Sequence, residues 1–360
     1  AADGKPMSKS RGNGVDPLKL MEDYGADGMR FGLLMQVTGA QDLKFNENKL
    51  VSSRNFANKI RNAARFVMMN LDDYTPGAPD PTTPADRWIF SRLARLVASI
   101  DEAYKEYEFS DMTRELYAFF WNEFCDWYIE LSKPRLAAGG QDRAACQRNL
   151  VFVLDTALRL LHPAMPFVTE QIYQDMPGEK DSPYLMMAAW PDAEELAAYI
   201  DPAAERALAI VTQSVSGIRS IRARYGISPK TKLEMTVKAQ SAEAVQLFEE
   251  QQNLIVALGN VEVVAVSETA EKPAESTMRL ADDVEIYVAL SGLVDFAAEQ
   301  ARIEKELGKL EKDRVKFDKK LSNPGFLSKA APEIIEKDRA KLADIVERMD
   351  RLQAELAEMK

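Results

Sequence analysis

The sequence predicts a mainly α-helical chain with a helical bundle, a small α/β domain and a C-terminal antiparallel coiled-coil hairpin. Three observations support this fold class. Helical periodicity dominates residues 46 to 176, β-rich segments occur between residues 233 and 290, and apolar residues at alternating spacings of three and four fill the chain beyond residue 293. At 360 residues the chain is too long for one ordinary core, so two or three domains are expected.

The composition describes a folded protein with an acidic surface. Hydrophobic residues make up 46% of the chain, charged residues 29%, and the formal net charge is −11. This charge argues against nucleic-acid binding over the whole surface, so any such contact must come from local basic patches. Two cysteines and one histidine supply neither a disulfide framework nor a four-ligand zinc site. No signal peptide and no run of about 18 apolar residues is found, so we expect a cytoplasmic location and no membrane contact.

A loop near the start of the chain, Met7-Ser8-Lys9-Ser10-Arg11-Gly12-Asn13, has the chemistry of a mobile phosphate clamp. Ser8 and Ser10 can satisfy the loop backbone, and Gly12 permits a close approach of backbone to an anion. Lys9 supplies a compact ammonium group for phosphate oxygens. A linker that carries these residue types by chance is the alternative.

Two short helices are expected after this loop. Asp16 and Pro17 form a strong helix start, Gly25 ends that helix, and a second helix covers residues 26 to 34. The segment from residue 39 to 45 has few regular signals and is expected to be a loop or a short extended stretch.

Four or five helices are expected between residues 46 and 176. The breaks between them fall at residues 75–79, 139–140, 162–163 and 177–178. An aromatic stripe at helical spacing is interpreted as core packing along one face of a long helix, with base stacking as the alternative; it comprises Tyr117, Phe120, Trp121, Phe124, Trp127, Tyr128 and Leu131. Cys125 within the stripe is expected to be a small buried hydrophobe, and His162 to have a capping or core role.

A change of pattern near residue 202 predicts the small α/β domain. We expect helices at residues 202–223 and 242–258, and strands at residues 233–238, 261–266 and 284–290. Residues 267–276 are expected to form a solvated loop.

The last part of the chain is expected to form an arm. Apolar positions repeat from Leu293 to Leu321 and again from Ile335 to Met359, with a turn at Ser322–Phe326 and a helix restart at Pro332. The two helices should fold back on each other. At about 1.5 Å per residue the first helix alone reaches roughly 40 Å.

Three basic patches stand out from the acidic background as candidate contacts with a polyanion. For each patch, the alternative is a role without ligand binding: a helix packed on its neighbours for the first, a solubilising turn for the second, and a solvated coiled-coil face for the third. The candidate residues are Arg54, Asn58, Lys59, Arg61, Asn62 and Arg65 in the first patch, Arg219 and Arg222 in the second, and Lys312, Arg314, Lys316, Lys319 and Lys320 in the third.

Several of these stretches resemble the class I aminoacyl-tRNA synthetases, and the valyl-tRNA synthetases in particular. Residues 6–10 resemble the K-M-S-K-S signature, with Pro6 where the first lysine usually stands and Lys9 in the place of the second. Residues 55–66 are similar to N-F-x-N-K-x-x-N-A-x-R-F, although Arg61 replaces a common tryptophan, and residues 121–128 are similar to W-x-x-F-C-D-W-Y. The terminal hairpin with its Asn-Pro-Gly-Phe turn extends the resemblance over nearly the whole chain.

The resemblance implies a domain order and a function. Residues 1–45 would end a catalytic domain and carry the ATP-binding loop at Met7, Ser8, Lys9 and Ser10, with Lys9 catalytic. Residues 46–200 would be an anticodon-binding bundle, 201–290 a small α/β domain, and 291–360 a tRNA-binding arm. The full enzyme would form valyl-adenylate from valine and ATP with Mg²⁺ and transfer valine to tRNA(Val), acting as a monomer.

One histidine cannot supply the H-I-G-H motif of this family. We therefore expect the chain to be a C-terminal portion that is inactive and binds no cofactor alone, with catalytic and editing domains in a missing N-terminal part. Isoleucyl enzymes usually end in a cysteine-rich zinc module, and leucyl enzymes do not usually end in this hairpin; both remain alternatives. A non-catalytic coiled-coil interaction protein is the competing class.

Overall fold

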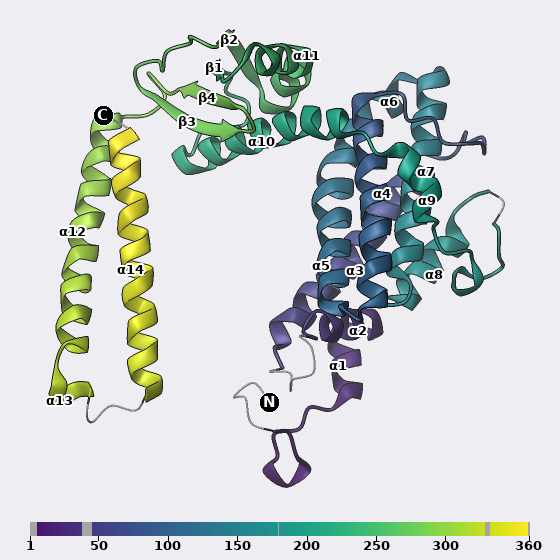
Figure 1. Cartoon of the computed structure of the whole chain (residues 1–360), viewed down its shortest axis with the longest axis horizontal. Coiled ribbons are helices and arrows are strands. Elements are labelled where there is room, and N and C mark those ends of the chain that lie inside the picture. The colour runs from purple at the N-terminus through teal and green to yellow at the C-terminus, as the bar shows by residue number, and fades with distance from the viewer. Residues whose placement is uncertain (1–5, 38–44, 179, 328–331, 359–360) are drawn as a thin grey trace. The chain divides into compact units, whose positions relative to one another are not determined.

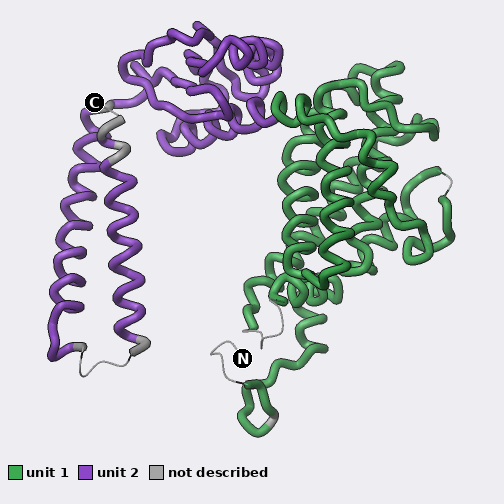
Figure 2. Tube along the Cα trace, viewed as in Figure 1, with its two compact units in different colours: residues 1–208 green, residues 209–360 purple. Residues whose placement is uncertain are grey.

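A computed structural model describes residues 6–37, 45–178, 180–327 and 332–358 of the chain. These residues form two compact units, residues 1–208 and residues 209–360 (Figures 1 and 2). Within the described ranges, no helix is long and apolar enough to cross a membrane. The mainly helical fold class is confirmed.

The first unit begins with short helices whose limits follow the predicted signals. A 3-10 turn covers Lys9–Arg11, α1 covers Pro17–Tyr24 and α2 covers Ala26–Leu34. The Asp16 carboxylate accepts a hydrogen bond from the Leu18 amide, which caps α1. Gly25 has φ = 75° and separates the two helices, because glycine adopts this left-handed region without a steric penalty. Residues 39–44, which are most of the segment expected as a loop, lie outside the described residues.

The bundle of the first unit consists of long helices packed side by side (Figure 1). Its elements are α3 (Glu47–Met68), α4 (Pro84–Lys105), α5 (Phe109–Tyr117), the π-helical η2 (Ala118–Tyr128), α6 (Ile129–Ala138), α7 (Gly140–Leu161) and α8 (Pro166–Asp175). Fully buried apolar side chains from different helices, such as Phe56, Ile100 and Leu154, form its core.

The aromatic stripe lies mostly on a π-helix and not on one face of an α-helix as expected. Phe120, Phe124 and Tyr128, spaced four apart, are buried, whereas Tyr117 and Trp121 are half-buried. A π turn closes with an i→i+5 hydrogen bond, so residues three apart no longer share a face. Core packing is therefore confirmed for the three rings spaced four apart, whereas the other three rings of the stripe, Tyr117, Trp121 and Trp127, are only half-buried.

The first unit ends with short elements. These are the 3-10 turn η3 (Leu185–Met187), the single-turn helix α9 (Ala193–Leu196), the 3-10 turn η4 (Ala197–Tyr199) and the start of α10 (Pro202–Tyr225). The rest of α10 belongs to the second unit.

The second unit contains a four-stranded sheet in the order β2-β1-β4-β3. Its elements are β1 (Leu233–Ala239), α11 (Ala242–Gly259), β2 (Val261–Ser267), β3 (Ser276–Ala281) and β4 (Val284–Ala289). β1 pairs parallel with β2 across α11 and antiparallel with β4. The sequence did not predict β3, an edge strand of mixed polarity that pairs antiparallel with β4.

One face of this sheet is covered by helix α10. A Cβ atom at Gly217 would lie 3.2 Å from the Arg279 Cβ atom on β3 and 3.4 Å from Ile286 on β4. The glycine therefore permits the close approach of helix and sheet. Buried Met235 and Val237 of β1 lie on the same face as Ile286, because antiparallel partners share a face.

The arm is an antiparallel helix pair, as predicted (Figure 1). It consists of α12 (Phe296–Leu321), the short α13 (Pro324–Leu327) and α14 (Pro332–Glu358). Ile303, Met349 and Leu352 are buried in the seam. Asp338 is also buried there, and the Lys320 Nζ atom lies 2.6 Å from its Oδ2 atom. A buried ion pair at one seam position favours a single register of the two helices.

Candidate nucleic-acid interface

The lysine loop is held in a tight turn by its own polar groups. The Ser8 amide donates to the Asn13 side-chain oxygen at 2.9 Å, and the Asn13 amide group donates to the Pro6 carbonyl at 3.2 Å. Ser8 and Ser10 bring their hydroxyl oxygens to 3.2 Å, and Gly12 has φ = 65°. The expected roles of the serines and the glycine in the loop backbone fit this geometry. The backbone of Lys9 begins the turn, but its side chain lies outside the described part of the structure.

Two side chains of α2 attach the segment after this loop to the corner between α7 and α8. The buried Asp27 carboxylate accepts from the amides of Phe167 and Val168 at 3.1 and 2.7 Å, and so caps α8. Arg30 donates to the carbonyls of Pro163 and Ala164, near the end of α7. Both contacts join residues more than 130 positions apart, so no local sequence signal could have identified them.

The basic patch on α3 is only partly available to a ligand. Arg61, Asn62 and Arg65 are exposed, and within the described residues their side chains make no hydrogen bond or ion pair. Arg54 lies over the Tyr24 ring at 5.8 Å and reaches the Asp23 carbonyl at 3.4 Å. The part of α3 that is available to a ligand therefore lies towards the C-terminal end of the helix.

Lys59, another predicted contact, is already engaged. Its ammonium lies 2.8 Å from an Asp126 oxygen and 5.0 Å from the centroid of the Trp121 ring. Trp121 in turn stacks on Tyr117 at 5.3 Å. Asn58 is exposed beside this cluster. The contact between α3 and η2 neutralises Lys59, which reduces its attraction for a phosphate.

The second patch contains one residue that the structure removes from the candidate surface. Arg222 is buried, and its guanidinium donates to the carbonyls of Ser228, Gly259 and Asn260 at 2.9 to 3.1 Å. Burial also lowers its pKa. Arg222 therefore holds the turn before β1 to the end of α11, and a phosphate has no access to it. Arg219 also has an interaction partner within the structure.

The third patch lies on α12 of the arm. Lys312, Lys316 and Lys319 are exposed and share one helical face, and within the described residues they form no ion pair. Arg314, which was predicted with them, is held between Glu311 at 2.7 Å and Asp318 at 3.2 Å.

The same face of α12 continues through two further exposed lysines, Lys305 and Lys309. Their spacing of three and four was a signal that could have added them to the predicted contacts. Lys320 is less available, because it pairs with Asp338 and lies over the Phe326 ring at 4.7 Å.

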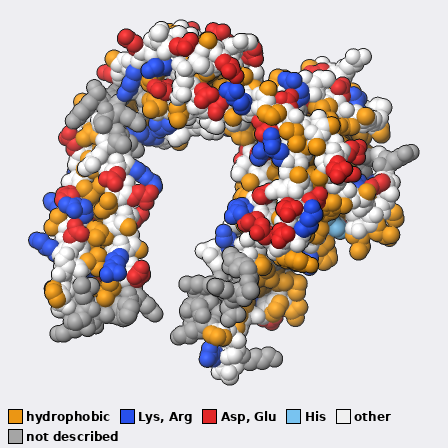
Figure 3. Space-filling view, viewed as in Figure 1, with side chains coloured by type: hydrophobic (Ala, Val, Ile, Leu, Met, Phe, Trp, Pro, Cys, Tyr) orange, Lys and Arg blue, Asp and Glu red, His pale blue; other side chains and the backbone are white. Residues whose placement is uncertain are grey.

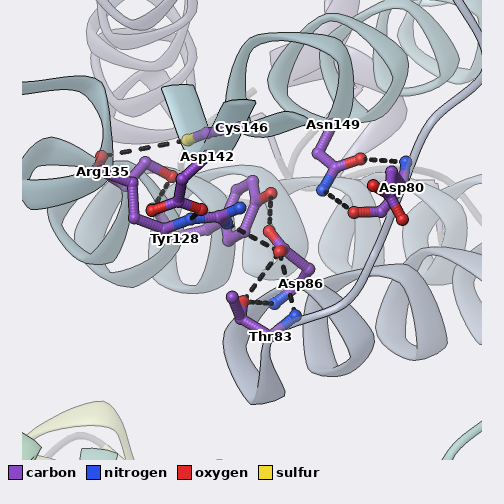
Figure 4. A network of polar contacts seen from close by, with 9 residues as sticks. Asp80, Thr83, Asp86, Tyr128, Arg135, Asp142, Cys146 and Asn149 are labelled. Atoms are coloured by element: carbon purple, nitrogen blue, oxygen red, sulfur yellow. Dashed lines mark hydrogen bonds and ion pairs between the residues drawn. The ribbon is translucent and has the colours of Figure 1, made fainter. Parts of the chain in front are cut away.

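A buried polar network fixes the part of the bundle around η2 (Figure 4). The Asp86 carboxylate, with an exposure of 0%, accepts from the Tyr128 hydroxyl at 2.6 Å and from Arg135 Nη1 at 2.7 Å. It also caps α4 with Thr83. Burial, together with the charge of Asp86, raises the pKa of Tyr128 well above its usual range. The network joins α4, η2 and α6.

Cys125 and His162 have the packing and capping roles that were expected of them. Cys125 is buried, and burial raises the pKa of its thiol to about 12. A thiol in this state is a poor nucleophile. His162 follows α7, its Nδ1 atom lies 2.8 Å from the Thr169 hydroxyl, and burial lowers its pKa. The capping role expected of His162 agrees with this position.

Acidic and basic side chains are interspersed on the face shown in Figure 3. In the described part of the chain, unpaired cations occur at Arg61 and Arg65 on α3 and on one face of α12, here called the lysine face, which carries Lys305, Lys309, Lys312, Lys316 and Lys319. They are therefore local features of an acidic body. Such patches can bind a polyanion locally, while the acidic surface around them does not attract it.

Comparison with known proteins gives a consistent result along the chain. Residues 1–46 match the model of class I tRNA synthetases (I, L, M and V), residues 86–237 match the anticodon-binding domain of tRNA ligases, and residues 295–360 match the valyl tRNA synthetase tRNA binding arm.

Curated relatives agree with these models. The valine–tRNA ligase of Geobacter sulfurreducens is 39% identical over 364 residues, which cover 100% of this chain and 41% of the relative. Those of Syntrophotalea carbinolica and Petrotoga mobilis are each 39% identical, over 99% of this chain and 40% of their own length. The chain thus spans about 40% of the relatives that it matches. It belongs to the valine–tRNA ligase family of class I aminoacyl-tRNA synthetases, as the C-terminal part of such an enzyme.

Proposed function

We propose that this chain holds tRNA(Val) for a valine–tRNA ligase that forms valyl-adenylate from valine and ATP and transfers the valyl group to the tRNA. The observation that carries the proposal is the order of the three matched models along one chain: catalytic-domain end, anticodon-binding domain and tRNA-binding arm. Catalytic and editing domains would precede the chain in a monomeric cytoplasmic enzyme. We assign residues 1–45, 46–200, 201–290 and 291–360 to the four functional parts.

Two surfaces are assigned to the tRNA. In the first unit, Asn58, Arg61, Asn62 and Arg65 offer charge and amide hydrogen bonds along α3, which suits a phosphate backbone. In the second unit, the lysine face of α12 offers charge alone. Lys59, Arg314 and Lys320 keep a smaller role because carboxylates already neutralise them. A large polyanion held at two places suits an acidic protein with local basic patches.

The lysine loop is assigned to the ATP phosphates. Attack of the valine carboxylate on the α-phosphate builds negative charge on the departing pyrophosphate. The ammonium of Lys9, on a loop that closes over the nucleotide, would stabilise that charge more in the transition state than in the ground state. Mg²⁺ is expected to accompany ATP. The described residues contain no group of three or more His, Cys, Asp or Glu side chains placed to hold a metal ion, so no ligand for it is assigned.

The role of Lys9 can be measured in the full-length enzyme by pyrophosphate exchange. Lys9→Ala is expected to lower the turnover number for adenylate formation much more than the affinity for ATP. Lys19→Ala on α1, outside the loop, is the matched control and should leave both constants unchanged. An unaltered turnover number for Lys9→Ala would contradict the assignment.

The tRNA surfaces can be tested by filter binding of this chain to tRNA(Val) and to an unrelated RNA of equal length. Replacing Lys312, Lys316 and Lys319 by Gln together should weaken binding about tenfold and lower the salt dependence by about one unit of slope per lost phosphate contact. Arg61→Gln with Arg65→Gln should act in the same direction.

The matched controls carry charges that the protein already neutralises. The double variant Lys59→Gln with Arg314→Gln removes two positive charges, as the Arg61 and Arg65 variant does, but is expected to change the affinity by less than about twofold. Equal losses for the control and test variants would show that only net charge matters. Equal affinity for tRNA(Val) and the unrelated RNA would count against a specific tRNA site.

A further inference from the structure

A cavity of about 620 Å³ opens in the first unit between α7, the end of α8 and two loops. Its volume lies in the range of small-molecule sites. One loop runs through Tyr74 to Pro79, and the other contributes residues 176–178, 180 and 181. The loops meet at Gly178, where a Cβ atom would lie 3.9 Å from the Tyr74 ring. Neither the α3 patch nor the arm contributes a residue to this cavity.

The floor of the cavity is one face of α7. Arg148, Phe152, Asp155 and Arg159 follow one another at spacings of four, three and four, so they lie along the same side of the helix. Arg148 and Asp155 are seven residues apart, which is about 10 Å along the helix axis. The floor therefore carries Arg148 at one end, the ion pair of Asp155 with Arg159 at the other, and the Phe152 ring between them.

Part of the lining is fixed by internal contacts. Arg159 donates to Asp155 at 2.8 Å and to Asp181 at 2.7 Å, and the Tyr173 hydroxyl donates to the Ser182 carbonyl at 2.8 Å. The Arg159 guanidinium, the Asp181 carboxylate and the Tyr173 hydroxyl are therefore engaged within the protein. They hold the second loop against α7 and so preform the cavity.

Other polar groups of the lining are left with unused hydrogen-bonding atoms. Arg148 uses only its Nε atom, which donates to the Ala78 carbonyl at 3.0 Å. Asp155 uses Oδ2 alone, as the acceptor for Arg159. Among the described residues, no partner is found for the Nη atoms of Arg148, for Asp155 Oδ1 or for the Tyr74 hydroxyl. Three residues of the lining, Arg148, Asp155 and Tyr74, therefore keep side-chain polar atoms that are available to a ligand.

We propose that this cavity binds a mononucleotide unit, with the phosphate on Arg148, the amino group of the base on Asp155 and the base between Tyr74 and the apolar floor. A guanidinium with two free nitrogens suits a phosphate, and a carboxylate oxygen accepts from an exocyclic amino group. The offset of about 10 Å between the two residues along the helix axis is of the same order as the length of an extended nucleoside monophosphate. A free nucleotide and an unstacked nucleotide of a bound RNA carry the same chemistry.

The proposal can be tested by titrating the whole chain with AMP in a calorimeter, with adenosine and ribose 5-phosphate as half-ligands. Arg148→Gln should weaken AMP and ribose 5-phosphate about tenfold and leave adenosine unchanged. Asp155→Asn should weaken AMP and adenosine to a similar extent and leave ribose 5-phosphate unchanged. Tyr74→Leu should weaken AMP and adenosine through the lost ring contact.

Arg114→Gln, an exposed arginine paired with Asp111 outside the cavity, is the matched control and should bind AMP like the parent chain. Because Asp155 also pairs with Arg159, thermal melting must first show that Asp155→Asn folds. The Arg148 and Tyr74 variants test the site independently if it does not.

A competition experiment identifies the source of the nucleotide. If tRNA(Val) displaces AMP, a nucleotide of the RNA enters the cavity; if AMP and tRNA bind together, the ligand is a free nucleotide. If the chain did not bind tRNA, the proposed function would be wrong, but the AMP titration would still test the cavity. AMP binding weaker than about 1 mM, or AMP binding that is the same in the Arg148, Asp155 and Tyr74 variants as in the parent, would overturn the proposal.

Discussion

The bundle and the arm are both built from long helices, but they bury their side chains differently. In the bundle, large side chains such as Phe56, Phe120 and Ile100 have an exposure of 0%. In the arm, Ile303 reaches 0%, and Met349 and Leu352 reach 9% and 8%. A pair of helices can bury only one seam, whereas helices in a bundle are covered on several sides.

Charged groups differ in the same way. Asp86 in the bundle is wholly enclosed and has partners on three elements, whereas Asp338 in the arm pairs with a Lys320 side chain that is 42% exposed. Desolvation makes an enclosed charge costly once its partner is lost, whereas water replaces a lost partner at an exposed charge, which in the arm pair applies to Lys320 but not to the buried Asp338. The comparison indicates that single substitutions should affect the bundle strongly and the arm weakly.

The largest expected effect comes from Asp86→Ala. It leaves Arg135 Nη1 and the Tyr128 hydroxyl without their acceptor in the interior, so the free energy of unfolding of the first unit should fall by about 3–5 kcal/mol. Tryptophan fluorescence in a urea titration measures this unit alone, because Trp88, Trp121, Trp127 and Trp190 all lie in it.

Asp142→Ala is the matched control. Asp142 also pairs with Arg135, at 2.6 Å, but its side chain is 52% exposed, so we expect a loss below about 1 kcal/mol. If both variants were equally destabilised, burial would not be the property that separates the two kinds of ion pair.

A smaller effect is expected from Ile303→Ala in the arm. Removing a fully buried side chain from a core costs about 2–5 kcal/mol, and a narrow seam that can close over the space should give a value near 2 kcal/mol. Far-UV circular dichroism should report the loss of arm helix while tryptophan fluorescence stays at the parent midpoint. Val315→Ala, at a side chain that is 37% exposed, is the control. A simultaneous shift of the fluorescence midpoint would mean that the two units unfold together.

Most of the helices and three of the four strands, β1, β2 and β4, could be predicted from the sequence because their signals are local. Asp16 with Pro17 fixes the start of α1, Gly25 fixes its end, and Pro332 starts α14, all as predicted. The break between α4 and α5 was not predicted. It occurs at Tyr107, which has φ = 58° without being glycine, so no Gly or Pro marks it in the sequence.

The candidate interface was harder to predict because the fold decides whether a basic side chain is free to bind a ligand. Arg222 and Arg61 look alike in sequence, yet one is buried against three carbonyls and the other is exposed. The neutralisation of Lys59 by Asp126 joins residues that are 67 positions apart. Charge patterns could therefore locate the basic helices but not the free cations on them.

The smallest expected effect is the loss of stability at low pH that comes from an exposed ion pair on the bundle. Hydrogen bonds from Arg159 lower the pKa of Asp181 from 3.8 to about 2. Because the folded-state pKa lies below the ordinary value, this stabilisation is complete above pH 3.8 and is lost as the pH falls towards 2. The Asp181 side chain is 43% exposed, so solvent screening should reduce the contribution to less than about 1 kcal/mol.

Asp181→Asn removes this titration. Its free energy of unfolding, followed by tryptophan fluorescence, should lie slightly below that of the parent at pH 6 and converge with it between pH 4 and pH 2. The loss at pH 6 should be several times smaller than that of Asp86→Ala, although both variants remove a carboxylate that binds an arginine in the same unit. A gap between Asp181→Asn and the parent that stays constant down to pH 2 would mean that the side chain acts through packing and not through its charge. A loss as large as that of Asp86→Ala would remove the distinction between enclosed and exposed pairs on which the comparison of bundle and arm depends.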